Sequence, residues 1–521
     1  MKHDGRVAFA SVVSWCSRIV AVLSGLVLIP VLFRHLGKEE LGVWLLLGQS
    51  WSVLGVLDFG FSPTLVRWIA LAKGNSGSDV DVVLGEESRR EIADLVTTGS
   101  RVFGFLAVIV FGIAWLLGYF YLSQMEFHNL SWHTALIAWT VLCVAQSVSV
   151  WAMIWPTLLF GLGFVGWDLV LESSMSIITI AVQIVVSLAG GGLVGLAIVQ
   201  AASAVISRVL FITFIRRYQS DIYHLRGRWN PAILKQITPP ALRCWLTTLG
   251  GVLIMQTDQF FVVQSRGAAQ LPSYRAAYLL CINVQMLAIS VARSSAPFIS
   301  QLWSAGEKAQ AQRLTRQGLF FGLGLMLTGI AVIFAAGEDL FRVWLGPGHF
   351  SGYRLLGVIS LVMLLETHSY VVSTSSRATE DEAFAGWGVA AGLLKVILSI
   401  VLVGPLGLIG IPAGTLIAQM LTNYWYMAYR GLKRLGIPWQ DHLRNVLFPV
   451  LLMFGLTVLV AFGARRGLLE RAPLVRLSGV IFACGLAFLT TCWLFVLDPG
   501  HRQKVLNRIS FRASRLDPDK T

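Results

Sequence analysis

Four cationic side chains lie inside stretches that are otherwise apolar: Arg18, Arg208, Arg293 and Lys395. A cation at the centre of a bilayer costs roughly 2.5–3.5 kcal/mol unless it faces water, a partner or a ligand. A chain that keeps several of them is expected to enclose a polar, positively charged cavity. The first hypothesis is therefore that an anionic cargo crosses a membrane through this protein.

The composition indicates that these cations are carried by helices that cross a membrane. Hydrophobic residues make up 56% of the 521 residues and charged residues only 13%, whereas globular proteins carry about 25% charged residues. Apolar runs longer than about 18 residues, the length that a helix needs to cross a bilayer, recur along the chain. The first run continues to Phe33 without a cleavage-site pattern, so we expect it to be a retained span.

Hydropathy divides the chain into about fourteen helical spans, and the fold class is an all-α polytopic membrane protein. Gly190–Gly192 and Gly404-Pro405 are expected to form tight turns between consecutive spans. The predicted spans are 8–33, 41–66, 98–122, 133–160, 168–189, 192–215, 245–264, 274–302, 318–337, 355–376, 384–403, 405–429, 445–464 and 474–497.

Lys and Arg predict the orientation of these spans. With the N-terminus in the cytoplasm, 27 of them lie in cytoplasmic segments and 10 on the other side. By the positive-inside rule, both termini are expected in the cytoplasm. The basic residues that give the net charge of +14 therefore flank spans, and this charge does not indicate nucleic-acid binding. The longest polar segments, 74–97 and 216–238, are too short for a folded domain outside the membrane, which argues against an enzyme of soluble substrates.

A weak internal repeat links the first and seventh spans. When the chain is shifted by 230 residues, Gly37 meets Gly267, Leu41 meets Leu271 and Trp44 meets Tyr274. This offset equals six spans and restores the same orientation. It predicts two parallel six-helix lobes with a site between them, followed by two additional helices. The predicted divisions are a first lobe, a cytoplasmic linker, a second lobe, and helices 13 and 14 with a basic tail, at 1–216, 217–237, 238–430 and 431–521.

Several segments resemble bacterial polysaccharide transporters, including the Wzx-like O-antigen and exopolysaccharide flippases of the multidrug/oligosaccharidyl-lipid/polysaccharide exporter superfamily. The resemblance is carried by Leu-Gly-Lys-Glu-Glu-Leu-Gly-Val-Trp from Leu36 and by Leu-Asp-Phe-Gly-Phe-Ser-Pro from Leu57. Asp258 with the later Tyr274, and the Gly-rich turn from Pro405 to Gly410, also resemble this family. Polar residues surround Asp258 where many members are apolar, so the role of this aspartate stays open.

The resemblance implies a flippase that moves a polyprenyl-diphosphate-linked oligosaccharide, an O-antigen or exopolysaccharide repeat unit, to the outer leaflet by alternating access. It implies a bacterial cytoplasmic (inner) membrane location, membrane lipids as surroundings, and a polymerase and glycosyltransferases as pathway partners. It implies no cofactor and no enzymatic activity. We expect coupling to a proton or sodium gradient.

The best candidates for binding a diphosphate head group are Arg18 and Arg293, because they lie mid-span in opposite halves. Guanidinium groups match phosphate oxygens in geometry and charge. Lys395 and Arg67 complete the candidate cationic cavity, although Arg67 could simply anchor its span. For each mid-span cation, the alternative is an internal salt bridge to Asp58, Asp258 or Glu172, and for Arg208 we favour a structural role.

Five titratable residues are candidates for ion coupling, since an intramembrane acid is a functional hypothesis by default. Glu366 and His368 lie two residues apart and so point to different faces of one helix, and His368 fits a hydrogen-bonded core residue better. No catalytic or metal-binding pattern accompanies them, and the six cysteines are scattered. The coupling candidates are Asp258, Glu172, Glu366, His368 and Asp58.

Three alternative functions stay open. A lipid II flippase would use the same fold and a similar cationic cleft. A multidrug/cation antiporter of the same superfamily needs acidic groups for its cargo and only twelve spans. A membrane glycan polymerase or ligase would use outward arginines, and here four arginines lie near the outward segment 464–476: Arg465, Arg466, Arg471 and Arg476.

Overall fold

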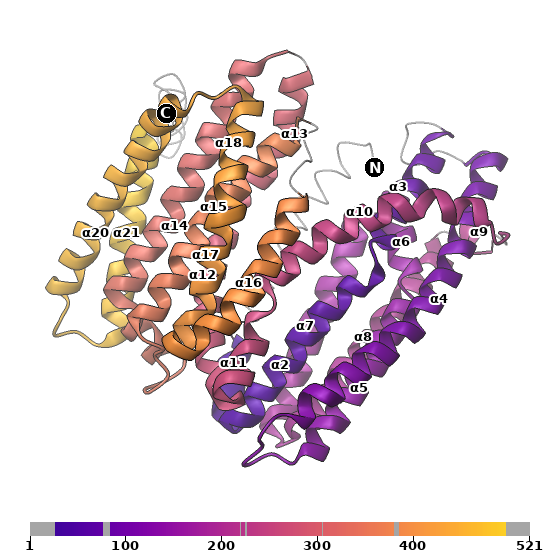
Figure 1. The fold of residues 1–521 in the computed structure, drawn as a ribbon, viewed down its shortest axis with the longest axis horizontal. Helices are drawn as coiled ribbons and strands as arrows, with labels where there is room; N and C mark the ends of the chain where they lie inside the picture. The colour runs from indigo at the N-terminus through magenta and orange to yellow at the C-terminus, as the bar shows by residue number, and fades with distance from the viewer. Residues whose placement is uncertain are drawn as a thin grey trace, which may run out of the picture. The chain divides into compact units, whose positions relative to one another are not determined.

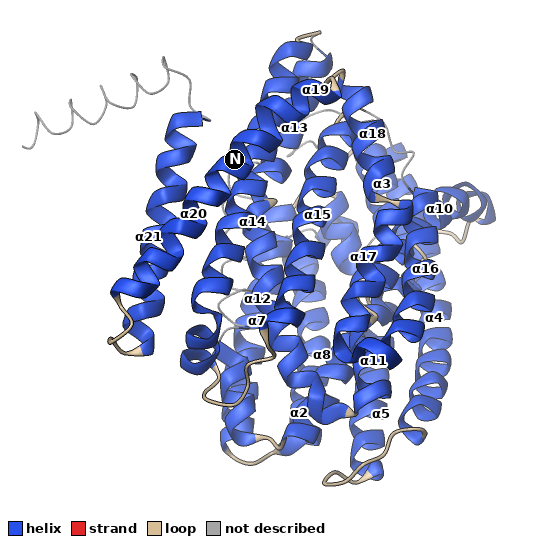
Figure 2. Ribbon diagram, turned by 60° about the vertical axis from the view of Figure 1, so that its left-hand side comes forward, coloured by secondary structure: helices blue, strands red, loops and turns tan. Residues whose placement is uncertain are grey.

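The computed structural model describes residues 25, 27–76, 84–218, 220–224, 227–304, 306–379 and 385–495. In these ranges the chain is mostly helical, with short loops between the helices, and forms no β-strand (Figures 1 and 2). Eleven helical stretches of this described part are long and apolar enough to cross a membrane. The predicted fold class, an all-helical polytopic membrane protein, is thus confirmed.

The eleven stretches account for most of the predicted spans. Predicted spans 384–403 and 405–429 both overlap one stretch, Gly386–Thr422, and predicted span 274–302 is not among the eleven. Most of predicted span 8–33 lies outside the described residues. The count of fourteen spans therefore stays a prediction.

The chain folds into two compact units. The first comprises Met1–Tyr274 and Ala385–Ile411, and the second comprises Arg275–Phe384 and Pro412–Thr521. These units are defined by the contacts between helices, whereas the predicted lobes are defined by counting six spans in each half. The predicted domain boundaries stay a prediction.

In the first unit, α4, α5 and α8 lie side by side, and α10 packs along α16 (Figure 1). A buried core that includes Leu65, Phe103, Leu158 and Phe211 joins α3, α4, α6 and α8. The helices of this unit are α2 (Lys38–Leu54), α3 (Phe61–Gly74), α4 (Glu86–Ser123), α5 (Trp132–Trp151), α6 (Ile154–Gly161), α7 (Val165–Leu188), α8 (Gly192–Tyr218), α9 (Ser220–Tyr223), α10 (Pro231–Met255), α11 (Asp258–Arg266) and α16 (Ala385–Leu406), with the 3₁₀ turns η1 (Gly55–Asp58), η2 (Ala268–Gln270) and η3 (Gly407–Ile409).

In the second unit, the long helix α14 contacts α13, α15, α20 and α21. The last two helices, α20 and α21, pack on one another and on α14 through Ala331, Ala335, Ala461 and Val480 (Figure 2). The helices of this unit are most of α12 (Leu271–Ala288), then α13 (Ser290–Ser304), α14 (Lys308–Trp344), α15 (Tyr353–Arg377), most of α17 (Gly410–Thr422), α18 (Tyr424–Leu435), α19 (Trp439–His442), a π-helical turn (Leu443–Leu447), α20 (Phe448–Gly467) and α21 (Pro473–Phe495).

The predicted span 41–66 is wrong as a continuous helix, because it breaks between α2 and α3. Phe59 and Gly60 both have positive φ, 51° and 73°, and the Asp58 carboxylate accepts a hydrogen bond from the Gly60 N–H at 2.8 Å. A short acidic side chain that bonds the backbone two residues on is a turn former. A β-carbon on Gly60 would also collide with the Ala241 carbonyl oxygen, so this turn is closely packed.

Two further boundaries differ from the prediction. The span predicted at 133–160 divides into α5 and α6, which are separated by residues 152–153. The turn predicted at Gly404-Pro405 lies slightly later, because Pro405 stays in the last turn of α16 and Gly407 takes the positive φ of 61°. The chain does reverse there, since the Ser399 hydroxyl donates to the Ile411 carbonyl at 3.3 Å.

A break in the seventh predicted span, 245–264, is the feature that positions a polar site. Helix α10 ends at Met255 and α11 begins at Asp258, and the backbone of Gln256 lies at φ −115° between them. Broken helices at membrane depth are tolerated where other groups satisfy the freed backbone, and they often carry ion or substrate sites. In this chain the break coincides with the polar run Gln256-Thr257-Asp258-Gln259.

Candidate functional site

A buried ion pair occupies the break between α10 and α11. The Lys395 ammonium of α16 lies 2.5 Å from the Oδ1 atom of Asp258, with the lysine side chain 0% exposed. Lys395 also donates to the Thr257 hydroxyl at 2.5 Å, and the Tyr274 hydroxyl donates to Asp258 Oδ2 at 2.7 Å. The ring of Phe261 lies 5.2 Å from the ammonium. The two opposite charges are therefore paired inside the first unit.

An amide network continues this site toward α2. Gln259 donates to the Gln49 carbonyl oxygen at 2.6 Å, and the Gln49 amide in turn donates to Gln256. Gln49 and Gln259 are 5% and 4% exposed. Amide groups that are removed from water need such partners, because an unpaired buried amide costs roughly 1–3 kcal/mol. The network fixes α2 against the break and so holds Asp258 in place.

Of the two roles considered for Lys395, cavity lining and an internal salt bridge, the structure shows the salt bridge. The lysine ammonium is buried and neutralised by Asp258, one of the carboxylates named as alternative partners. Asp58, by contrast, bonds its own turn. A buried charge that loses its partner is strongly destabilising, so Lys395 and Asp258 depend on one another. The part of Lys395 in head-group binding stays a prediction.

A second carboxylate, the half-buried Glu366, lies in the second unit on α15. It accepts hydrogen bonds from the side-chain amide of Gln419 on α17 and from the Tyr424 hydroxyl, the latter at 3.4 Å. Asn423 donates to Gln419 at 3.1 Å and extends this network. All the hydrogen-bond partners that the described residues give Glu366 are neutral.

His368, two residues along the same helix, contacts a different partner. Its Nε2 atom lies 3.1 Å from Nε2 of His442, which is 0% exposed, just before the π-helical turn. The two residues thus point to different neighbours, as the spacing predicts. The contact fits the core interpretation of His368 and ties α15 to α19.

The remaining predicted cations divide by location. Arg18 lies outside the described residues. Arg67 on α3 and Arg293 on α13 both have exposed side chains, one in each unit. Arg208 on α8 is half-buried beside Phe211. Glu172 lines a groove with Arg208. The binding roles of Arg18, Arg67 and Arg293 stay predictions.

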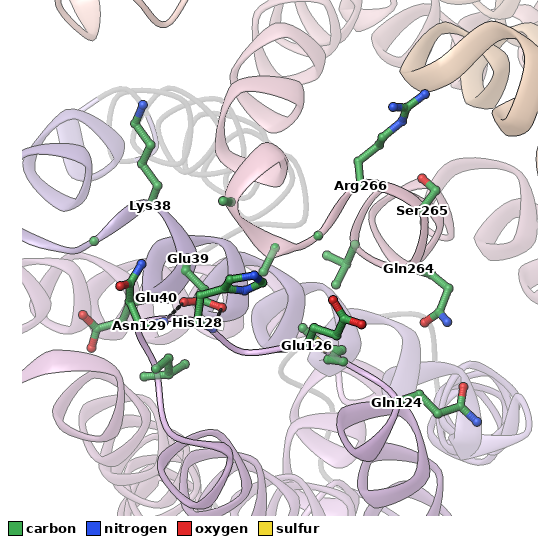
Figure 3. A pocket seen from close by; sticks show the side chains of 17 residues that line it. Lys38, Glu39, Glu40, Gln124, Glu126, His128, Asn129, Gln264, Ser265 and Arg266 are labelled. Carbon is green, nitrogen blue, oxygen red and sulfur yellow. Dashed lines mark hydrogen bonds between the residues drawn. The ribbon is translucent and has the colours of Figure 1, made fainter.

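The loops predicted to face outward in the first unit surround a polar cavity of about 1220 Å³ (Figure 3). Glu39 accepts hydrogen bonds from the backbone N–H groups of His128 and Asn129, at 2.9 and 2.6 Å. Glu40 accepts one from Leu193 at 2.7 Å. Loops that the orientation rule assigns to the same side of the membrane thus meet at one end of this unit.

The two segments that carry the internal repeat also meet at this cavity. A β-carbon on Gly42 would lie 1.8 Å from the Ala268 carbonyl oxygen, so η2 is seated directly on α2. Lys38 and Arg266 project away from the centre of the cavity in Figure 3, and Glu126 and His128 lie closer to it. These polar groups come from loops, where exposed polar residues are ordinary.

One of the four arginines that are predicted to face outward has a structural partner. Arg476 on α21 donates through Nε to Asp339 on α14 at 3.0 Å and through Nη1 to the Leu469 carbonyl at 2.9 Å. Its Nη2 atom forms an ion pair with the same aspartate. This arginine therefore anchors the final helix pair to α14 inside the second unit.

Sequence reasoning noted the polar residues beside Asp258 but missed Gln49 and Gln419. Gln49 joins Gln256 and Gln259 in one amide network beside the break, and Gln419 donates to Glu366. The sequence does carry a signal for these residues, because each glutamine is a polar residue within or beside an otherwise apolar run. Polar residues of this kind are expensive in lipid and so need partners. Which partners they find depends on helix packing that the sequence does not state.

Comparison with solved structures identifies the fold. The chain matches the lipid II flippase MurJ in an inward closed conformation at 16% identity and a TM-score of 0.67, covering 94% of this chain and 98% of that one. It matches an inward-facing multidrug resistance MATE family transporter of the MOP superfamily at 15% identity and a TM-score of 0.59, covering 79% and 94%. A MOP superfamily transporter from Pyrococcus furiosus matches at 14% identity and a TM-score of 0.50, covering 83% and 97%.

No protein-family model and no curated protein matches the sequence. At such low identities the structural likeness establishes the fold, which is that of MOP superfamily transporters.

Proposed function

We propose that this chain is a flippase that moves a polyprenyl-diphosphate-linked oligosaccharide, such as an O-antigen or exopolysaccharide repeat unit, across the bacterial cytoplasmic membrane. Both termini lie in the cytoplasm in this proposal. The protein works by alternating access, without a cofactor and without enzymatic chemistry. A polymerase and glycosyltransferases of the same pathway would supply and use the cargo.

The observation that carries the proposal is the extent of the match to a lipid flippase. The MurJ structure is matched over 94% of this chain, whereas the two transporters of the wider superfamily leave 21% and 17% of it unmatched. A likeness over nearly the whole chain favours a lipid-linked cargo over a soluble drug. The sugar carried by that lipid is inferred from the sequence resemblance alone.

The cargo would be bound through its diphosphate by arginines of both units. Arg18 and Arg293, assisted by Arg67, offer guanidinium forks that match phosphate oxygens. Because Arg293 and Arg67 are exposed and lie in different units, movement of the units would change the binding of one ligand. A ligand can shift a conformational equilibrium only by such a difference in affinity.

Proton coupling, in this proposal, occurs at Glu366. Its hydrogen-bond partners Gln419 and Tyr424 carry no charge, so nothing among the described residues compensates an ionised carboxylate there. Asp258 already has a cationic partner in Lys395 and therefore has less need of an external cation. Coupling to a sodium gradient is the other outcome that the experiment below distinguishes.

The test uses the purified chain in proteoliposomes. A polyprenyl-diphosphate-linked oligosaccharide is placed in one leaflet, and its appearance in the other leaflet is measured under imposed proton or sodium gradients. We expect transport by the wild-type chain and at least about a tenfold loss in Arg18→Ala and Arg293→Ala, since charge-assisted hydrogen bonds contribute about 1.5–3 kcal/mol each. Arg342→Ala, an exposed arginine paired with Glu338 in its own helix, is the control.

A second candidate function is a lipid II flippase, because the MurJ structure has the highest TM-score of the three structures compared. Lipid II and a cationic drug are therefore offered to the same proteoliposomes. Transport of lipid II but not of the other lipid-linked oligosaccharide would select the second candidate. Transport of the drug alone would contradict a lipid-linked cargo and favour a multidrug antiporter.

A further inference from the structure

Two stripes of polar residues face one another on α7 and α8 in the first unit. On α7 they are Glu172, Ser176, Thr179 and Gln183, at spacings of four, three and four residues, which place them on one helix face. On α8 they are Gln200, Ser203, Ser207 and Arg208. Both helices are otherwise apolar and long enough to cross a membrane.

These residues line a groove of about 450 Å³, together with Ser149 of α5. Toward one end, Gln183 donates to Gln200 at 3.1 Å, and the hydroxyls of Thr179 and Ser203 are hydrogen-bonded to each other. Ser176 is exposed and Ser207 is half-buried, with no mutual hydrogen bond in the described structure. Part of the groove is thus closed by internal pairs and part presents free hydroxyls.

Glu172 and Arg208 bring opposite charges to the lining of the groove at its other end, and Asp168 lies near Arg208 without lining the groove. Glu172 is exposed, while Asp168 is 8% exposed, and both lie within electrostatic range of Arg208. Within the described part of the chain, Asp168 Oδ1 and Arg208 Nε are buried without a hydrogen-bond partner. Orphaned atoms of opposite charge are costly when buried. Because these atoms are covered, the charged groups that the groove itself offers to a ligand are the exposed carboxylate of Glu172 and the half-buried guanidinium of Arg208.

A purely structural function does not require this many polar groups. Helix pairs in lipid can associate through small residues, so polar side chains beyond the cross-helix pairs add cost without need. The groove has the size of a small-ligand site, which typically spans about 300–1,000 Å³. Its hydroxyl and amide groups both donate and accept hydrogen bonds. Its acidic and basic groups largely offset one another, which disfavours a bare anion or cation.

We infer that this groove binds the neutral saccharide portion of the cargo. Sugar hydroxyls both donate and accept hydrogen bonds, and one or two sugar residues would use the free hydroxyls of Ser176 and Ser207 and the charged end at Glu172 and Arg208. The inference rests on the proposed flippase function. It adds a sugar site within the first unit that is separate from the arginines that bind the diphosphate.

The experiment fills the groove and compares two cargoes in proteoliposomes. Ser176→Leu and Ser207→Leu place apolar bulk on its walls, and leucine is well tolerated in spans that face lipid. The probes are polyprenyl diphosphate that carries a neutral disaccharide and polyprenyl diphosphate without sugar. We expect transport of the sugar-bearing lipid to fall about tenfold in each variant, as loss of one or two hydrogen bonds would give, and transport of the sugar-free lipid to change less than about twofold.

Ser174→Leu is the matched control, because Ser174 is exposed on the same helix but does not line the groove. It should leave transport of both lipids unchanged. Equal effects of Ser176→Leu on the two lipids would overturn the saccharide site. So would Glu172→Gln, if it stopped transport of both, because the groove would then be an ion path. Failure of the wild-type chain to move either lipid would instead overturn the proposed function, on which this site depends.

Discussion

Asp258 in the first unit and Glu366 in the second are both carboxylates placed at membrane depth, but their surroundings differ. Asp258 has a lysine ammonium at 2.5 Å and a tyrosine hydroxyl at 2.7 Å. Glu366 has an amide and a tyrosine hydroxyl, and no cation among its described partners. The first site is an ion pair complete in itself, and the second leaves a negative charge without compensation.

This difference shows that burial alone does not decide what an intramembrane acid does. A charge that the protein itself neutralises can hold helices together in every state of a transport cycle. A carboxylate with only neutral partners is suited to gain and lose a proton, because no other cation balances it. On this basis we propose a holding function for Asp258 and a switching function for Glu366, and four substitutions test the proposal.

The largest effect is expected from Lys395→Met. It removes the only cation that contacts Asp258 within the described structure and leaves the carboxylate buried. Breaking a buried pair on one side typically costs about 3–5 kcal/mol, so the free energy of unfolding in detergent should fall by about that amount. The double variant Lys395→Met with Asp258→Asn should recover most of the loss. A single variant as stable as the wild-type chain would contradict the ion pair.

A smaller loss is expected from Tyr274→Phe. The ring is retained, but Asp258 Oδ2 loses the hydroxyl that donates to it at 2.7 Å. A hydrogen bond to a charged group contributes about 1.5–3 kcal/mol, and the same unfolding measurement should report that decrease. In the background of Asp258→Asn the effect of Tyr274→Phe should shrink, because the charge is gone. Equal effects in both backgrounds would show that the hydroxyl does not act on Asp258.

For Glu366→Gln, stability should change by no more than about 1 kcal/mol, because the new amide oxygen can still accept from Gln419 and Tyr424. Transport is where this variant should differ. If Glu366 is the proton site, the transport rate of the variant no longer responds to an imposed pH gradient. An unaltered response would move the coupling site elsewhere.

Tyr424→Phe is expected to have the smallest effect. Its hydroxyl lies 3.4 Å from Glu366, a long hydrogen bond, so its removal should lower the free energy of unfolding by less than about 1 kcal/mol. The contrast with Tyr274→Phe is the informative quantity. Similar losses for the two tyrosines would erase the distinction between a carboxylate that is paired with a cation and one that has only neutral partners.

The sequence predicts the class of fold well, because spans are set by the length of apolar runs. Breaks within spans are less predictable, since averaging over a window hides single polar residues. The break after Met255 and the turn at Asp58 both occur at polar residues that hydropathy alone passes over. Asp58 reads as an acid in a span, but its oxygen bonds a glycine two residues later.

The residues of the candidate site could be predicted from the sequence, but the contacts between them could not. Asp258 and Lys395 are each conspicuous in the sequence, but 137 positions separate them and several carboxylates were equally eligible partners. The packing of α10 along α16 determines which carboxylate pairs with Lys395. The polar stripe on α7 could have been found from its spacing, because Glu172, Ser176, Thr179 and Gln183 follow helical periodicity in an apolar segment.

The adjacent glutamates at the start of α2 have a consequence for biogenesis. Glu39 bonds the backbone of His128 and Asn129, and Glu40 bonds Leu193, which follows 153 residues later in the chain. During synthesis, α2 therefore enters the membrane long before its carboxylates can find these partners. The start of this helix completes its hydrogen bonds only after the turn before α8 has been synthesised, so α2 depends on segments far beyond the helix that follows it.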